Sequence, residues 1–176
     1  MANIIKSNVV GNREKGGEKV GKSIVLTRID NRLVHGQIVG EWAGCVGANL
    51  LVIADDDVVK DSVDRSIMKI AGDALGLGTR FFTIEETIAK IDKASSSQKI
   101  LLICRTPSSL RKIIEGGVEI DNVCVGNMHP SKGKKRISDK VYVDAQDVSD
   151  LKYIQSHVKD FYIQDVPDEE KINYKF

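Results

Sequence analysis

The sequence predicts an α/β protein with a single open, mostly parallel twisted sheet of about seven strands and helices on both faces. Two observations support this. From Ser23 onward, short β-branched or apolar runs alternate with segments whose apolar residues recur at helical spacing. Helices of this length between strands imply right-handed crossovers, which produce a parallel sheet covered by helices. The length of 176 residues suits one domain with a substantial core.

The first half of this domain is expected to begin with a β-branched strand, followed by a short helix that ends near Gly47. A buried strand follows, and the next helix is predicted from apolar residues that recur at helical spacing and form one face: Val59, Val63, Ile67 and Ile70. The other elements of this half are the strand Ser23–Ile29, the helix Gln37–Cys45, the strand Leu50–Ala54 and a short strand at Phe81 and Phe82.

The second half shows clear helix-start signals. Thr83 and Glu86 fit a capping box that opens the helix Ile84–Lys93. Thr106 and Pro107 suit the cap and first residue of the next helix, which Gly116 and Gly117 end, and Asp144 caps a helix that runs through His157. The remaining strands are expected at Ile100–Arg105, Asn122–Val125, Val141–Val143 and Phe161–Val166.

Composition excludes several classes of protein. Lys and Arg total 26 against 25 Asp and Glu, so no overall charge favours nucleic acid. The longest apolar run, Ile100–Cys104, is too short to span a bilayer, and the first residues lack a secretory signal. Three widely spaced cysteines, Cys45, Cys104 and Cys124, suit a reducing cytoplasm. Residues 1–22, rich in glycine and basic residues, are predicted to be a flexible extension before a domain at 23–176.

The first strand–helix junction carries the strongest chemical signal. Active sites of open parallel sheets lie at the carboxyl ends of the strands. There the segment Arg28–Gln37 places two arginines, a carboxylate and a histidine within eight residues. The ordinary pKa of histidine leaves one nitrogen of His35 free to attack at neutral pH. A helix beginning near Gly36 would aim backbone N–H groups at a phosphate on that ring.

The neighbouring charged residues suit phosphoryl transfer. Arg32 and Arg28 are candidates to neutralise the oxygens of a transferring phosphoryl group. Asp30 is a candidate to accept the second ring N–H of His35 and so fix the tautomer. The alternative is a solvated loop that holds a structural histidine.

The segment Arg28–Gln37, with the letters RIDNRLVHGQ, resembles the phosphorylation-site loop of the mannose–fructose–sorbose class of phosphotransferase-system IIB subunits. The likeness continues collinearly at Gly47–Asp57, Lys99–Pro107, Glu115–Gly117 and Val125–His129. It implies that His35 is the phosphorylated nucleophile and Arg32 its assisting residue. The candidates to bind the phosphate or support the loop are Arg28, Asp30, Gly36, Gln37 and Asn127. Within the class, Val125–His129 and Lys99–Pro107 resemble the N-acetylgalactosamine type, with mannose, fructose and sorbose as alternative sugars.

The resemblance also implies partners. Such a subunit accepts a phosphoryl group from a phosphorylated IIA protein or domain and passes it to a sugar held by the membrane subunits IIC and IID. It would be cytoplasmic and peripherally associated with the transporter, and it needs no cofactor and no Mg²⁺. No nucleic-acid partner is expected, and a homodimer is possible.

Two other functions remain open at the level of sequence. Gly16–Ser23 formally satisfies the pattern of a P-loop, but the residues that follow read as a strand where a P-loop requires a helix. The second alternative function is that of a regulatory module with the same fold and no catalytic activity. His129 and His157 are read as a rim residue and a helix-end residue, the acidic run Asp55–Asp57 as a helix start, and the basic run Lys132–Arg136 as a solvated loop.

Overall fold

The computed structural model describes residues 23–176. Within them the chain forms a six-stranded sheet in the order β3-β2-β4-β1-β5-β8, in which every neighbouring pair is parallel. The strands of this sheet are β1 Ile24–Asp30, β2 Leu50–Ala54, β3 Gly78–Phe82, β4 Ile100–Cys104, β5 Asn122–Asn127 and β8 Asp160–Ile163. A separate antiparallel ribbon pairs β6 Lys135–Ser138 with β7 Val141–Val143.

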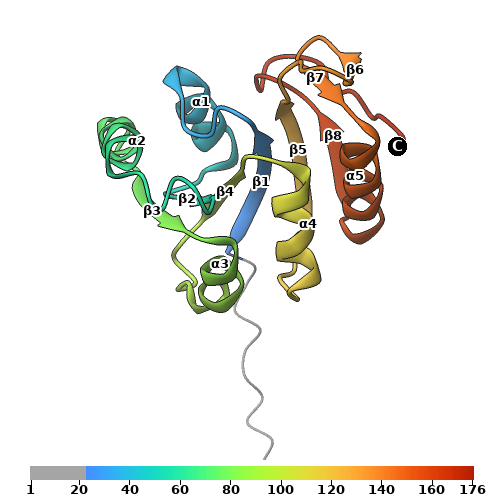
Figure 1. Ribbon diagram of the computed structural model, residues 1–176. Coiled ribbons are helices and arrows are strands. Elements are labelled where there is room, and N and C mark those ends of the chain that lie inside the picture. The colour runs from blue at the N-terminus through green and yellow to red at the C-terminus, as the bar shows by residue number, and fades with distance from the viewer. Residues whose placement is uncertain (1–22) are drawn as a thin grey trace, which may run out of the picture.

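Helices cover both faces of the sheet (Figure 1). One face packs on α1 Gly36–Val46 and α2 Ser62–Ala74 through a cluster that includes Trp42 and Met68. The other packs on α3 Ile84–Lys90, the 3₁₀ turn η1 Ile91–Lys93, α4 Pro107–Glu115 and α5 Ala145–His157. The central strands are buried on both faces, so Leu50–Ala54 and Ile100–Cys104 are continuous apolar runs. The predicted fold class is therefore confirmed.

The strand order creates a switch point between β1 and β4. The chain leaves β1 into α1 on one face, whereas it leaves the neighbouring β4 into α4 on the other face. The two connections diverge at the carboxyl ends of β1 and β4, the place at which doubly wound sheets bind ligands. Residues that follow β1, β4 and the adjacent β5 therefore meet at one edge.

The predicted helix starts are confirmed. Thr83 and Glu86 form a capping box at α3, and Thr106 accepts a hydrogen bond from the backbone N–H of Ser109 at the start of α4. Asp144 caps α5 in a second capping box. Among the described residues, no helix is long and apolar enough to cross a membrane.

Two strand predictions and one loop prediction need correction. Val141–Val143 lies outside the main sheet, in the ribbon with β6, so the sheet has six strands. Part of the basic run Lys132–Arg136 belongs to β6, because Lys135 and Arg136 pair with β7. The last strand ends at Ile163, three residues earlier than predicted. Gln164 and Asp165 instead turn toward the carboxyl edge, where their backbone carbonyls accept hydrogen bonds from Arg28.

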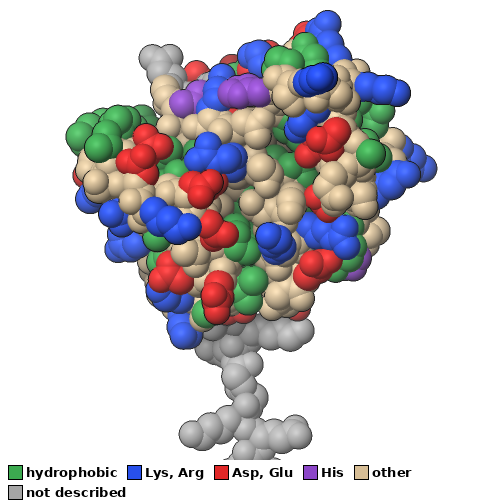
Figure 2. Space-filling view, viewed as in Figure 1, with side chains coloured by type: hydrophobic (Ala, Val, Ile, Leu, Met, Phe, Trp, Pro, Cys, Tyr) green, Lys and Arg blue, Asp and Glu red, His purple; other side chains and the backbone are tan. Residues whose placement is uncertain are grey.

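Helix α2 presents its apolar stripe to solvent. The side chains of Val63, Ile67 and Ile70 are 65%, 60% and 68% exposed, whereas Met68 and Gly72 face the sheet. The predicted helix is present, but it begins after Val59. Figure 2 shows hydrophobic side chains gathered over the region of α2. The periodicity gave the helix correctly and did not reveal which face is buried.

This orientation makes a prediction for two adjacent residues. Met68→Ala should lower the free energy of unfolding by roughly 2 kcal/mol or more, because it leaves a cavity against the sheet. Ile67→Gln should change it by less than about 0.5 kcal/mol, because the side chain is already in water. Urea denaturation measures both. An equal loss in the two variants would show that the stripe is covered within the folded chain.

Candidate functional site

Asn31 joins the three central strands at the carboxyl edge. Its side-chain amide donates to the carbonyl of Arg105, which follows β4, at 2.8 Å. Its backbone N–H donates to the carbonyl of Asn127 at the end of β5, at 3.0 Å, and its Oδ1 accepts from the backbone N–H of His129. The segments that follow β1, β4 and β5 therefore meet at one place. Asn31 itself was not among the predicted site residues.

The loop from Asp30 to His35 has a constrained backbone. Leu33 has a φ of 56°, in the left-handed region that bulky residues rarely adopt, and its backbone N–H donates to the carbonyl of Asp30 at 3.1 Å. The side chains of Leu33 and Val34 are buried in the core and hold this conformation. Backbone strain that is held by packing is typical of functional sites.

His35 occupies the N-cap position of α1, but its side chain makes no capping hydrogen bond. Ring Nδ1 lies 3.1 Å from the carbonyl oxygen of Leu33, and a carbonyl only accepts, so Nδ1 carries the proton here. Nε2 is buried and has no hydrogen-bond partner among the described residues. Attack through Nε2 leaves the Leu33 contact in place, whereas attack through Nδ1 requires it to break.

The Leu33 contact corrects the prediction that Asp30 orients the ring of His35. The Asp30 carboxylate is 1% exposed and binds the two arginines of the segment. Its Oδ2 accepts from Arg28 Nη2 at 3.1 Å, and its Oδ1 accepts from the backbone N–H of Arg32 at 3.0 Å and from Arg32 Nε at 3.4 Å. Asp30 therefore organises the loop arginines.

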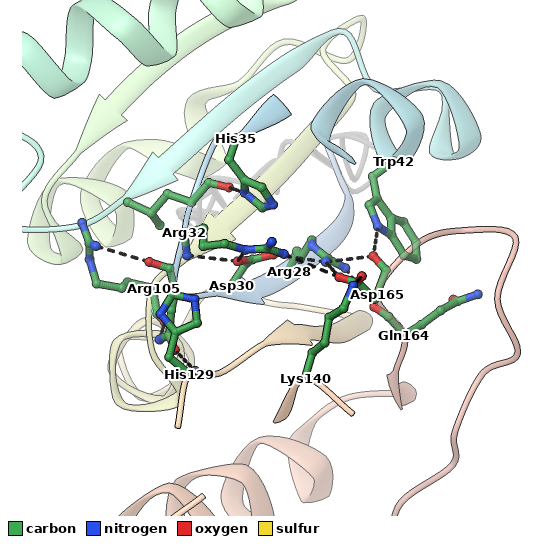
Figure 3. Close-up of polar contacts among 12 residues, drawn as sticks. Arg28, Asp30, Arg32, His35, Trp42, Arg105, His129, Lys140, Gln164 and Asp165 are labelled. Atoms are coloured by element: carbon green, nitrogen blue, oxygen red, sulfur yellow. Dashed lines mark hydrogen bonds and ion pairs between the residues drawn. The ribbon is translucent and has the colours of Figure 1, made fainter. Parts of the chain in front are cut away.

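Arg32 keeps an unused donor. Its side chain is 30% exposed, and one edge of the guanidinium faces Asp30. Nη2 is buried, lies 3.6 Å from Asp165 Oδ1, and makes no hydrogen bond within the described chain. Buried donors are almost always hydrogen-bonded, so an exception suggests a functional role. In the view of Figure 3, the ring of His35 lies above the Arg32 guanidinium.

Arg28 lies beneath the site and does not line it. Its guanidinium donates to the carbonyls of Gln164 and Asp165 at 3.0 and 2.9 Å, and to Asp30. The ring of Trp42 lies 5.1 Å from its Cζ. Arg28 is 2% exposed, so its position fits support of the loop and not contact with a transferring group.

Asp165 and Lys140 were not anticipated from the sequence. Asp165 Oδ1 lies 3.6 Å from both Arg28 Nη2 and Arg32 Nη2, and its Oδ2 pairs with Lys140 Nζ (Figure 3). Asp165 was hidden because it was assigned to a strand. Lys140 was hidden because only the pairing of β7 with the end of β5, which the sequence does not show, brings it to this edge.

Arg105, which follows β4, and Asp55, which follows β2, form an ion pair at the carboxyl edge of the sheet. Arg105 Nε donates to Asp55 Oδ2 at 2.7 Å, and Asp55 also accepts from the backbone N–H groups of Asp57 and Val58. Burial alone would raise the pKa of Asp55, but these hydrogen bonds outweigh it and hold that pKa below its usual value. The run Asp55–Asp57 is not the predicted helix start, because α2 begins at Ser62 and is capped by Asp61. Asp55 instead closes a turn and pairs with Arg105.

The other supporting residues lie close by. Asn127 is buried opposite Asp30 in the pairing of β1 with β5. Gly36, with a φ of 49°, begins α1. Gln37 lies in the first turn of α1, and its side chain falls outside the described part of the structure.

The remaining histidines and thiols do not form a second site in the described residues. His157 ends α5 with Nδ1 at 2.7 Å from the carbonyl of Tyr153, as expected for a helix-end residue. Burial raises the pKa of Cys104, and it raises that of Cys124 to about 12, so neither thiol ionises readily at neutral pH. Within residues 23–176 no cluster of His, Cys, Asp and Glu could hold a metal ion.

Known proteins match most of the chain. A sequence model of the family described as "PTS system sorbose subfamily IIB component" matches residues 24–175. The N-acetylgalactosamine-specific phosphotransferase enzyme IIB component 1 of Escherichia coli is 54% identical over 149 residues, which cover 85% of this chain and 94% of that protein. Component 2 of the same organism is 39% identical, with coverage of 86% and 96%.

Solved structures agree with these matches. The crystal structure of the N-acetylgalactosamine-specific IIB component 1 from Escherichia coli matches with a TM-score of 0.83 and covers 86% of this chain and 99% of that one. The IIBSor domain of the sorbose permease from Klebsiella pneumoniae matches with a TM-score of 0.78 at 26% identity and covers 85% and 92%.

The packing beneath the site predicts opposite effects for two glycines. A Cβ on Gly126 would lie 1.9 Å from Arg28 Nη2, whose guanidinium is pinned by Asp30 and two carbonyls. Gly126→Ala should therefore lower the free energy of unfolding by about 3 kcal/mol or more. Gly44→Ala should raise it by up to about 1 kcal/mol, because its Cβ meets nothing within 4 Å and alanine favours a helix.

Thermal or urea denaturation of the two variants tests this prediction. Equal stability of the Gly126→Ala protein and the wild type would mean that Arg28 leaves its pocket at little cost.

Proposed function

The chain belongs to the sorbose subfamily of phosphotransferase-system IIB components, which are phosphotransferases, and from this membership we propose that His35 is its phosphate carrier. His35 takes a phosphoryl group from a phosphorylated IIA protein or domain. It then passes the group to a sugar that enters through the membrane subunits IIC and IID. The intermediate is a phosphohistidine.

The position of His35 carries the proposal, and two neighbouring features support it. His35 stands at the carboxyl end of β1, at the switch point of the sheet, and caps α1 without a side-chain hydrogen bond. The first turn of α1 contains no acidic residue, so the positive end of the helix dipole is not offset there. The buried Arg32 Nη2 adds a donor without a hydrogen-bond partner in the described chain. Together these groups form a site for an anion on the His35 ring.

The chemistry follows from this arrangement. The phosphorus–nitrogen bond of the donor breaks as a bond to a ring nitrogen of His35 forms. Charge on the three equatorial oxygens is neutralised by Arg32 and by the backbone N–H groups at the start of α1. In the second step the oxygen of a sugar hydroxyl bonds to phosphorus as the phosphorus–nitrogen bond to His35 breaks, and the hydroxyl proton balances the charge on the ring nitrogen that is released. Neither step calls on a cofactor.

The sugar that the relatives' names favour is N-acetylgalactosamine. The two Escherichia coli components named for this sugar are 54% and 39% identical to the chain, whereas the sorbose-permease domain is 26% identical. We propose the same sugar here. The reaction with phosphorylated IIA would take place in the cytoplasm, at the cytoplasmic face of the transporter.

A P-loop function has less support. The segment Gly16–Ser23 lies outside the described residues except for Ser23, and the chain continues from there into β1 where a P-loop requires a helix. A regulatory module without catalysis would leave the unpaired donor of Arg32 beside His35 unexplained.

Label transfer tests the carrier residue. Incubation with phosphoenolpyruvate, the two general phosphotransferase proteins and the matching IIA should place acid-labile phosphate on His35 and nowhere else in the chain. His35→Ala should abolish the label. His129→Ala should keep it, because the described contact of His129 with this edge is made by its backbone N–H. Label that persists in His35→Ala would refute the assignment.

Arg32→Ala separates a catalytic from a structural role. It should slow transfer from IIA and onward to sugar by on the order of 10²-fold or more, comparable to about 3 kcal/mol of transition-state stabilisation. Arg32→Lys should recover part of the rate, because lysine keeps the charge without the planar fork. Circular dichroism should show a native fold for both variants. A folded Arg32→Ala protein that transfers at the wild-type rate would assign the role to backbone groups.

A further inference from the structure

Asp165 holds a fixed position although it follows the last strand of the sheet. Its backbone carbonyl accepts two hydrogen bonds of 2.9 Å, one from Arg28 Nη2 and one from Trp42 Nε1. Both donors are buried, and Asp165 itself is 7% exposed. The backbone therefore fixes the position of the Asp165 carboxylate. A substitution that removes the charge of this side chain does not require the backbone to move.

The carboxylate is shared among three cations. Oδ1 lies 3.6 Å from Arg28 Nη2 and 3.6 Å from Arg32 Nη2, and Oδ2 pairs with Lys140. Arg28 is held by other partners as well, namely Asp30 and the carbonyl of Gln164. Arg32 has fewer described partners than Arg28. Its side chain is 30% exposed, and its described side-chain contacts are with the carboxylates of Asp30 and Asp165.

The distance between Arg32 and Asp165 has a consequence for function. At 3.6 Å the two groups attract each other through charge, but Nη2 is too far to form a hydrogen bond. Asp30 holds the opposite edge of the same guanidinium through Nε. The plane of the guanidinium is thus set by two carboxylates while Nη2 keeps its donors for another acceptor.

Lys140 is brought to Asp165 by the β6–β7 ribbon. The carbonyl of Lys140 accepts from the backbone N–H of Met128 at 2.9 Å, and the backbone N–H of Tyr142 donates to the carbonyl of Met128 at 3.0 Å. The turn of the ribbon is therefore anchored just after β5. From there the half-exposed side chain of Lys140 reaches Oδ2 and forms an ion pair with it.

We propose that Asp165 is the positioning residue for Arg32, and that Lys140 moderates its pull so that Arg32 is oriented without being hydrogen-bonded to it. This rests on the proposed phosphorylation of His35. Loss of the Asp165 charge leaves the Nη2 edge of Arg32 without a counter-charge, and the guanidinium rotates out of its orientation. Loss of Lys140 strengthens the pull of Asp165, and Nη2 closes on Oδ1.

A double-mutant cycle tests the proposal. Asp165→Asn should lower the turnover rate of phosphoryl transfer through His35 by about tenfold and leave the KM for phosphorylated IIA unchanged, because the carboxylate is only 7% exposed. In an Arg32→Ala background the same substitution should change the rate less than about twofold, because its effect runs through Arg32. A purely structural role would slow both backgrounds equally.

Asp150→Asn is the matched control. Asp150 is 2% exposed and accepts from Arg111 and Gln146 on the α4–α5 side of the molecule. The Asp150→Asn substitution removes a carboxylate that is about as buried as that of Asp165. It should lower the stability of the protein and leave the transfer rate unchanged. The ¹⁵N–¹H resonance of Arg32 Nε gives a second readout. It should shift in Asp165→Asn, whereas that of Arg105, paired with Asp55, should not.

Lys140→Met serves if Asp165→Asn does not fold, since Lys140 is half exposed. It should slow transfer about threefold in the wild-type background and have no effect in Arg32→Ala. A wild-type rate in every variant that folds, or equal losses with and without Arg32, would overturn the role of Asp165. Absence of phosphate on His35 in the wild-type protein would instead overturn the proposed function.

Discussion

The buried guanidinium of Arg28 is the contact on which the rest of the carboxyl edge depends. A charge at 2% exposure is stable only if it is paired and hydrogen-bonded. Arg28 meets this requirement with Asp30, the carbonyls of Gln164 and Asp165, and the ring of Trp42. These partners belong to β1, to the segment after β8 and to α1. One side chain therefore ties both ends of the domain to its central strand.

The same constraint fixes the chemistry above it. Arg28 sets the direction of Asp30, which in turn binds the backbone N–H and the Nε of Arg32. Asp165 closes the group from the other side, and Lys140 completes it. Three cations thus face two carboxylates at an edge where the dipole of α1 adds further positive potential. A phosphoryl group on His35 would enter a field that already favours negative charge, with little rearrangement of the protein.

Sequence alone predicted the fold class and the elements well, because each local signal agreed with the fold. The amino-acid sequence predicted the helix caps at Thr83, Thr106 and Asp144. It also predicted that His35 follows the first strand. The family resemblance drawn from Arg28–Gln37 is confirmed by the match over residues 24–175. These features depend on neighbours in the chain.

The parts that sequence missed depend on residues far apart in the chain. Asp165 lies 137 positions from Arg28, and its role requires β8 to end early, which no local signal marks. Lys140 arrives through the pairing of Met128 with Val141. The partner of the His35 ring was misassigned because the left-handed backbone of Leu33, which turns its carbonyl to Nδ1, is unusual for leucine. The exposed apolar stripe on α2 has the same cause. The periodicity identifies an apolar helix face but does not show what packs against that face.

Intact mass spectrometry at neutral or alkaline pH tests the central claim, that one histidine of this chain carries a phosphoryl group between a protein donor and a sugar. After incubation with phosphoenolpyruvate, the two general phosphotransferase proteins and the matching IIA, the chain should gain the mass of a single phosphoryl group. The gain should disappear on brief acid treatment and on addition of transporter membranes with N-acetylgalactosamine. An unchanged mass under conditions that phosphorylate the IIA, or a gain that survives acid, would contradict the account.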